Sequence, residues 1–259
     1  MENKTNIIML LDRSGSMDSI KEETILGFNS FIKKQIESNP NTLISLYQFD
    51  DKYDKVFENT PLSNCPELNK YSFIPRGLTA LLDAIGITIK RNKPIKNKLD
   101  IETNEQTVFV IITDGYENAS EKFTLSKVHN LIKKMESKHN WQFVYLGANQ
   151  DAIKVAATFG IDEKRAIKFA SDSLGTRDVF YSTAERVSES ILMCNEIRFS
   201  MADREKQNRV DNPEKENIKT NKRRLLSALN RRMNLSDIPR RKRIIKYNQH
   251  YKSMEQLSS

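Results

Sequence analysis

Three oxygen-bearing side chains alternate near the start of the chain, in the sequence Asp12-Arg13-Ser14-Gly15-Ser16. Alternate residues of an extended turn can point the same way, so Asp12, Ser14 and Ser16 could converge on one cation. Carboxylate and hydroxyl oxygens suit Mg²⁺, Ca²⁺ or Mn²⁺ rather than zinc or copper. Because two of these three ligands are neutral hydroxyls, the ion would keep most of its charge and attract a further carboxylate.

Two later residues offer the remaining ligands. Thr79 stands just before an apolar helical pattern, and Asp114 directly follows the apolar run 108–112. Mg²⁺ requires a nearly octahedral shell, which three protein groups cannot supply. The sequence therefore predicts that Thr79 and Asp114 join the first three residues in one site.

The elements around these residues place them at one edge of a sheet. The apolar run Ile7–Leu11 is typical of a short buried strand, and helical spacing follows over 19–38. Asp12 thus lies in the turn between a strand and a helix, and Asp114 occupies the same position after a second strand. In open α/β sheets this carboxyl edge is where ligands bind.

The ordered set resembles the metal-ion-dependent adhesion site (MIDAS) of von Willebrand factor A domains of the prokaryotic or phage type. That motif consists of D-x-S-x-S, then a lone threonine, then an aspartate after a buried strand. Its five positions are filled here by Asp12, Ser14, Ser16, Thr79 and Asp114. The alternative is that these are ordinary turn and helix-cap residues, a common role for Ser, Thr and Asp.

The resemblance implies a fold and a mode of binding. The fold is α/β, a Rossmann-like three-layer sandwich with a central, mostly parallel six-stranded sheet, one antiparallel edge strand, and helices on both faces. Ser14, Ser16 and Thr79 would be hydroxyl ligands of Mg²⁺, with Mn²⁺ or Ca²⁺ possible. Asp12 and Asp114 would bind the ion directly or through water. A Glu or Asp carboxylate of a protein partner would fill the last position.

Further patterns predict the rest of the domain. Strands at 43–49 and 53–57 form a hairpin, whose Asp50 and Asp51 are interpreted as solvated turn residues. Tyr116, Glu117 and Asn118 line the rim, either as specificity residues or as a plain loop. Asn149 or Asp151 caps the helix at 151–159. The other expected elements are helices at 124–138 and 179–197 and strands at 141–146 and 166–170.

Composition bounds the class of protein. The chain has 259 residues, of which 38% are hydrophobic and 29% charged, as in globular proteins. No apolar run approaches the ~18 residues of a membrane span, and no signal-peptide pattern is present, so we expect a cytoplasmic protein. The two cysteines and three histidines form neither a disulfide framework nor a zinc site.

Charge separates the chain into two parts. From residue 200 to the end, 16 Lys and Arg stand against 7 Asp and Glu, a net charge of +9. We therefore predict a von Willebrand factor A-like domain over 1–199 and a basic, partly helical or flexible C-terminal extension over 200–259. Residues 222–252 combine basic runs with helical apolar spacing, which suits nucleic acid, an anionic membrane surface or an acidic partner. The alternative is a solvated tail whose leucines pack on the domain.

These observations favour a non-enzymatic, metal-dependent protein-binding module. A nucleic-acid-associated scaffold that binds through the tail is the second hypothesis. A metal-dependent hydrolase is the third, and the sequence disfavours it. No histidine or cysteine lies near the motif to act as a base or nucleophile. An aspartate that directly follows a strand, as Asp12 does, also resembles the haloacid-dehalogenase phosphatases. Those enzymes need a second aspartate two residues further on, where this chain has Ser14.

Overall fold

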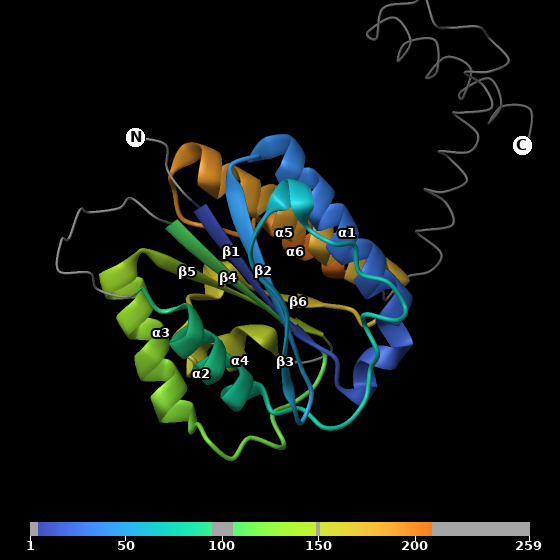
Figure 1. The fold of residues 1–259 in the computed structure, drawn as a ribbon, viewed down its shortest axis with the longest axis vertical. Coiled ribbons are helices and arrows are strands. Elements are labelled where there is room, and N and C mark those ends of the chain that lie inside the picture. The colour runs from blue at the N-terminus through green and yellow to red at the C-terminus, as the bar shows by residue number, and fades with distance from the viewer. Residues whose placement is uncertain (1–4, 95–105, 149–150, 209–259) are drawn as a thin grey trace, which may run out of the picture. The chain divides into compact units, whose positions relative to one another are not determined.

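A computed structural model of the chain describes residues 5–94, 106–148 and 151–208. Within these ranges six strands form one sheet in the order β3-β2-β1-β4-β5-β6 (Figure 1). Every neighbouring pair is parallel except β2 and β3, so the predicted sheet with one antiparallel edge strand is confirmed. The strands are β1 (Thr5–Asp12), β2 (Thr42–Phe49), β3 (Tyr53–Pro61), β4 (Gln106–Thr113), β5 (Trp141–Ala148) and β6 (Ala166–Phe169).

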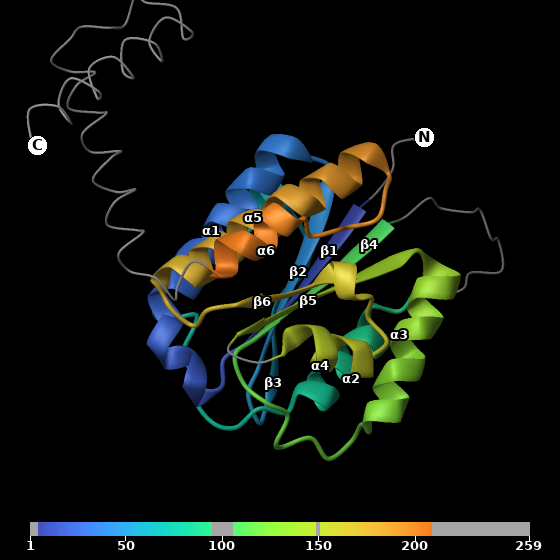
Figure 2. The same ribbon diagram turned by 180° about the vertical axis from the view of Figure 1, so that it is seen from behind.

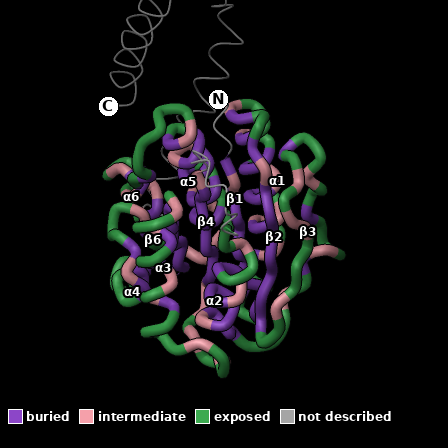
Figure 3. The backbone as a smooth tube through the Cα atoms, turned by 60° about the vertical axis from the view of Figure 1, so that its left-hand side comes forward, coloured by how far each residue is buried: buried purple, intermediate pink, exposed green. Residues whose placement is uncertain are grey.

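Helices cover both faces of the sheet, as predicted (Figures 1 and 2). One face packs on α1 (Lys21–Ser38) and α5 (Ser173–Met193) through a core that includes Phe28 and Phe180. The other face packs on α2 (Leu81–Asn92), α3 (Leu125–His139) and α4 (Ala152–Thr158). Because both faces are covered, the inner strands are buried almost throughout (Figure 3), which explains their continuous apolar runs. Short 3₁₀ helices span Gly15–Ile20, Leu62–Asn64 and Glu163–Arg165.

Side-chain caps fix where several helices begin. Asp151 caps α4 by accepting a hydrogen bond from the Lys154 amide at 3.2 Å, as predicted, whereas Asn149 lies outside the described residues. Asp172 accepts from the amides of Leu174 (3.0 Å) and Gly175 (2.8 Å). That cap starts α5 at Ser173, six residues before the predicted start at 179.

The end of α5 also differs from the prediction. The helix stops at Met193, because Cys194 adopts a left-handed conformation with φ of 49°. Cys194 is therefore exposed, although it falls inside the predicted helix 179–197, and Ile197 is buried in the loop that follows the helix. Leu125 is the first residue of α3 and is 42% exposed.

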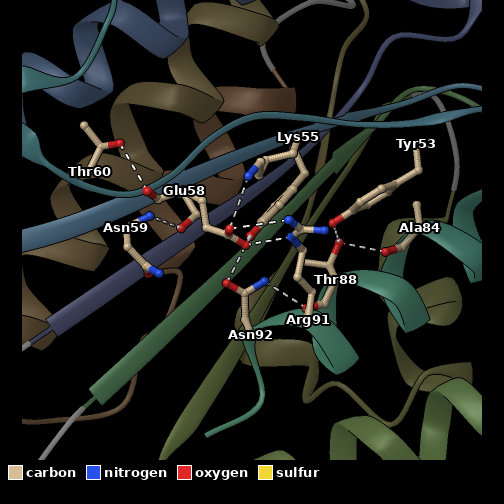
Figure 4. A network of polar contacts seen from close by, with 11 residues as sticks. Tyr53, Lys55, Glu58, Asn59, Thr60, Ala84, Thr88, Arg91 and Asn92 are labelled. Carbon is tan, nitrogen blue, oxygen red and sulfur yellow. Dashed lines mark hydrogen bonds and ion pairs between the residues drawn. The ribbon is translucent and has the colours of Figure 1, made fainter.

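The antiparallel edge strand is longer than predicted and is tied to α2 by polar contacts (Figure 4). The Glu58 carboxylate accepts hydrogen bonds from the Tyr47 hydroxyl at 2.6 Å and from Arg91 Nε at 2.7 Å. Thr88 Oγ1 donates to the Tyr53 hydroxyl at 3.0 Å. These contacts hold the helix that follows the Thr79 loop against the sheet.

One further helix, α6 (Met201–Gln207), lies in the predicted extension and packs on the domain. Its Asp203 pairs with Arg186 Nε of α5 at 3.1 Å. Its Arg204 donates to the carbonyl oxygens of Ala166 (2.9 Å) and Glu163 (2.7 Å). The division at residue 199 stays a prediction, and the basic segment 222–252 lies outside the described residues. No helix of the described ranges has the length and apolar character needed to cross a bilayer.

Candidate metal-binding site

Three loops meet at the carboxyl edge of the sheet, and main-chain hydrogen bonds join the first two. The loop after β1 receives a hydrogen bond from the Arg76 amide to the Arg13 carbonyl oxygen at 2.7 Å. In return the Gly15 amide donates to the Gly77 carbonyl oxygen at 3.2 Å. The D-x-S-x-S turn is thereby fixed against the segment that carries Thr79.

The third loop, after β4, is joined to the second by a reciprocal pair of bonds. The Thr79 amide donates to Asn118 Oδ1 at 2.9 Å, and the Asn118 amide donates to the Thr79 carbonyl oxygen at 3.1 Å. Glu117 supports the same junction, because its carboxylate accepts from the Leu82 amide at 2.8 Å. Of the three predicted rim residues, Glu117 and Asn118 therefore position the loop, while Tyr116 is 65% exposed.

The oxygen atoms of the predicted ligands converge. Ser14 Oγ and Ser16 Oγ are 3.1 Å apart, and Ser16 Oγ donates to Asp114 Oδ1 at 2.6 Å. A Cβ atom built on Gly115 would lie 2.8 Å from Thr79 Oγ1 and 3.6 Å from Ser14 Oγ, so both hydroxyls lie close to this glycine. The structure thus brings together residues from three loops that are far apart in sequence.

Asp12 lies deepest in the site and shapes its first loop. The residue is fully buried, with Oδ1 accepting from the Ser14 amide at 2.7 Å and Oδ2 from Thr113 Oγ1 at 2.6 Å. Burial raises the pKa of Asp12 to about 6, although the hydrogen bonds from Thr113 and Ser14 oppose the shift. Burial also raises the pKa of Asp114. A nearby cation would favour the ionised form of both carboxylates.

The donor set fits a hard divalent cation. An octahedral ion with oxygen ligands at ~2.05 Å has neighbouring ligands ~2.9 Å apart, close to the spacing of Ser14 Oγ and Ser16 Oγ. The described residues contain no group of three His, Cys, Asp or Glu placed to hold a metal. The site therefore depends on its hydroxyls as well as on its two carboxylates.

Asp50 is the residue that the sequence interpretation placed wrongly. It is not a solvated turn residue but fully buried, and it accepts hydrogen bonds from Arg13 Nε at 3.0 Å and Arg76 Nε at 2.8 Å. Its main-chain oxygen accepts from the Ala80 amide at 3.0 Å, so Asp50 touches both ligand-bearing loops. The sequence offered only a weak signal for this role, the arginines beside the two loops, and it did not show which acid would pair with them.

Gly77 allows the Thr79 loop to approach Asp50 closely. Its φ of +68° is a left-handed conformation that side chains rarely adopt, and a Cβ here would collide with Asp51 Oδ1. Asp51 itself is exposed, in agreement with the prediction for that residue.

Comparison with known proteins identifies the family. The family model for the von Willebrand factor type A domain matches residues 6–181. Domains of this family are typically metal-dependent protein–protein interaction modules. No curated protein sequence matches the chain.

Solved structures share the fold at low sequence identity. Proximal thread matrix protein 1 from the mussel byssus, described with a zinc-occupied MIDAS motif, has a TM-score of 0.51 and 15% identity over 70% of this chain and 47% of its own. A mutant of the PilB minor pilin from Streptococcus sanguinis has a TM-score of 0.54 and 10% identity over 75% of this chain and 64% of its own. The pilus adhesin SpaC from Lactobacillus rhamnosus GG, in an open conformation, has a TM-score of 0.56 and 10% identity over 73% of this chain and 30% of its own.

The chain spans about half the length of the mussel proteins that it matches. At these identities the neighbours establish the fold alone. The family rests on the matched model, which covers well over half of the chain together with the loops described above. This chain belongs to the family of von Willebrand factor type A domains.

Proposed function

We propose that this protein is a non-enzymatic, cation-dependent protein-binding module. Asp12, Ser14, Ser16, Thr79 and Asp114 hold a divalent cation at the carboxyl edge, and a Glu or Asp side chain of a partner completes its shell. The observation that carries the proposal is the convergence of the Ser14 and Ser16 hydroxyls and the Asp114 carboxylate, with neighbouring oxygens 3.1 and 2.6 Å apart.

The charge of the site supports a carboxylate as the partner group. Three of the five ligands are neutral hydroxyls, and Asp12 is already engaged by two hydrogen bonds from the protein. The carboxylates of Asp12 and Asp114 together offset the formal charge of a divalent ion, but the three hydroxyls are weak donors, so the ion would stay electrophilic toward the open side of the site. A partner carboxylate would be a strong ligand for the position of the octahedral shell that the protein leaves open.

The surroundings of the site support binding rather than catalysis. Catalysis of hydrolysis would need a general base or nucleophile within hydrogen-bond reach of the reacting atoms. In the described part of the chain, the side chains hydrogen-bonded to the five ligands are those of Thr113, Asn118 and Ser19 and of the ligands themselves, and none of them is a histidine or a cysteine. Leu78 and Tyr116, close to the ligands in sequence, are exposed. These neighbours offer contact area to a partner.

Mg²⁺ is the proposed ion. Its short bonds and octahedral shell match the close spacing of the serine hydroxyls, whereas Ca²⁺ prefers more ligands at 2.3–2.6 Å. Because one structural neighbour is described with zinc in its MIDAS motif, a comparison of Mg²⁺, Mn²⁺, Ca²⁺ and Zn²⁺ belongs in the first titration.

A thermal melt of the full chain in MgCl₂ and in EDTA tests the metal site. At Mg²⁺ about one hundred times its Kd, linkage stabilises the folded state by about 2.7 kcal/mol, or roughly 5–10 °C in Tm. Ser14→Ala removes one ligand and should abolish most of this increase. Ser126→Ala, at an exposed position of α3, is the matched control and should behave as wild type. An equal Mg²⁺-dependent increase in Ser14→Ala would contradict the proposal.

A nucleic-acid-associated scaffold is the second candidate, favoured by the net charge of +9 beyond residue 199. The two modes respond differently to the medium. Binding through the metal site should be lost in EDTA, whereas binding through Lys and Arg to phosphates should survive EDTA and fall steeply with added salt.

A further inference from the structure

A cleft of about 440 Å³ opens at the same edge of the sheet, beside the metal site. Its lining combines an exposed aromatic ring, aliphatic side chains and two basic residues. The residues that matter here are Tyr116, Ala152, Ile153, Ile167, Lys168 and Arg204.

The cleft is adjacent to the proposed ion. Tyr116 follows Asp114 by two residues, so their Cα atoms are at most about 7.6 Å apart. The pairing of the strands locates Lys168, at the far end of the cleft, relative to Thr113. Thr113 pairs with Gly147 of β5, and Gly147 pairs with Lys168 of β6. Two strand spacings place the Lys168 Cα about 10 Å from that of Thr113. Figure 2 shows β5 and β6 side by side at this edge of the sheet.

Basic side chains outnumber acids at the cleft. Asp151 at its mouth pairs with Lys154, with Nζ 2.8 Å from Oδ2, and its pKa is lowered first by Lys154 and more weakly by the charge of Lys168. Lys168 is exposed and lies within 4 Å of no carboxylate in the described part of the chain. Arg204 donates only to carbonyl oxygens, so its charge is not cancelled by an acid among the described residues. A second anionic group would therefore be attracted to the Lys168 end.

Exposed apolar side chains lie between the two charged ends and beside them. Tyr116 is 65% exposed and Ile153 36% exposed, and Leu78, next to Thr79, is 57% exposed. Large apolar side chains exposed around a binding site are typical of surfaces that contact a partner. Tyr116 is the one aromatic ring among the described lining residues and offers bases a single stacking surface, whereas the aliphatic Ile153 and Ile167 suit a peptide better than a nucleic acid.

We propose that the partner of this site is an acidic peptide segment with two carboxylates about three residues apart. The first carboxylate completes the shell of the metal ion, and the second pairs with Lys168. An apolar side chain between them packs on Tyr116 and Ile153. The spacing is estimated from the ~10 Å between the Cα atoms of Thr113 and Lys168, which mark the two ends, and the ~3.3 Å rise per residue of an extended chain. This inference rests on the proposed function, since the metal ion anchors the first carboxylate.

Selection from a random peptide display library tests it. The full chain is immobilised in MgCl₂, and bound peptides are released with EDTA. We expect the released peptides to be enriched in two acidic residues three positions apart, with an apolar residue between them. Binding of one enriched synthetic peptide is then measured by fluorescence polarisation.

Charge reversal at Lys168 tests the contribution of the cleft to peptide binding independently of the metal site. Lys168→Glu should lower the affinity for the enriched peptide about three- to tenfold, because it replaces a partly exposed ion pair with a repulsion between like charges. It should leave the Mg²⁺-dependent Tm increase unchanged. Lys164→Glu makes the same change of charge at an exposed position just before β6 begins, and it should bind as wild type.

Each contrary outcome has its own meaning. EDTA-released peptides with a single acid, or an equal effect of Lys168→Glu and Lys164→Glu, would overturn the inference and leave the proposed function standing. Loss of single-stranded DNA binding, rather than peptide binding, in Lys168→Glu would assign the cleft to nucleic acid and also overturn it. If EDTA releases no peptides at all, the proposed function itself is contradicted, and the inference falls with it.

Discussion

Ser16 Oγ donates a 2.6 Å hydrogen bond to Asp114 Oδ1, across 98 residues of sequence. This bond joins the loop after β1 to the loop after β4 at the position where both residues are proposed to bind a cation. The hydroxyl proton satisfies a carboxylate that burial has made less acidic. The same two oxygens are proposed to face the cation.

Asp114→Asn should separate metal binding from folding. The amide keeps the size of the side chain and removes one negative charge near buried Asp12, whose pKa the Asp114 charge helps to raise. We expect the metal-free Tm to stay the same or rise by a few degrees, while the increase caused by Mg²⁺ is lost. Melts in EDTA and in MgCl₂ measure both effects. A variant that still gains the wild-type increase in Mg²⁺ would remove Asp114 from the ligand set.

The effect of Mg²⁺ should depend on pH through Asp12. Burial raises the pKa of Asp12 to about 6, above its value in the unfolded chain. In the metal-free protein its contribution to stability is thus fully present below pH ~4 and is lost as the pH rises through ~6. Metal binding has the opposite dependence, because the ion competes with the proton. The apparent affinity for Mg²⁺ should fall about tenfold per pH unit below ~6.

Melts with and without Mg²⁺ at pH 5.0 and 7.5 measure this competition. The increase in Tm should be clearly larger at pH 7.5. Equal increases at the two pH values would show that Asp12 does not change its protonation when the metal binds.

Asp50 should contribute to stability as well as to the geometry of the site. Asp50→Ala removes the buried counter-ion of Arg13, which is 8% exposed and would then pair only with the half-exposed Asp54. Loss of one partner of a fully buried pair costs about 3–5 kcal/mol, so we expect a loss of up to that size. Burial would raise the pKa of Asp50, but hydrogen bonds from Arg76 and the Lys52 amide and the charge of Arg13 outweigh it and lower the pKa. The stabilisation is therefore present above pH ~4 and is lost as the pH falls further.

Urea unfolding at pH 7 measures the change for Asp50→Ala. Asp51→Ala, at the adjacent exposed position, is the control and should change the free energy of unfolding by at most about 0.5 kcal/mol. Similar losses in the two variants would mean that the buried ion pairs do not stabilise the loops.

The meeting of Asp12, Ser14, Ser16, Thr79 and Asp114 at one edge could be predicted from sequence, because these residues flank strongly patterned elements, whereas their role as ligands stays a prediction. The apolar runs before Asp12 and Asp114 fixed the strands, and parallel strands bring their carboxyl ends to one edge. The role of Asp50 could not be predicted, since it depends on two arginines that reach it from other loops. The early start of α5 at Ser173 was missed because its first turn has little apolar periodicity and owes its position to the Asp172 cap. Sequence periodicity reports burial, whereas the start of α5 depends on a local cap and the role of Asp50 on tertiary contacts.

Gly115→Ala should obstruct the metal site without removing a ligand. A Cβ atom at this position would lie 2.8 Å from Thr79 Oγ1, closer than real contacts allow, so the Thr79 hydroxyl must move away from its position near Ser14. We expect the affinity for Mg²⁺, measured by isothermal titration of the full chain, to fall at least about tenfold, which is ~1.4 kcal/mol. Gly15→Ala is the matched control in the opposite loop, because its Cβ would meet only the Gly77 carbonyl oxygen at an ordinary 3.6 Å. Both variants add one methyl group beside the site, and only the first displaces a proposed ligand. Wild-type affinity in Gly115→Ala would show that Thr79 Oγ1 does not contact the ion.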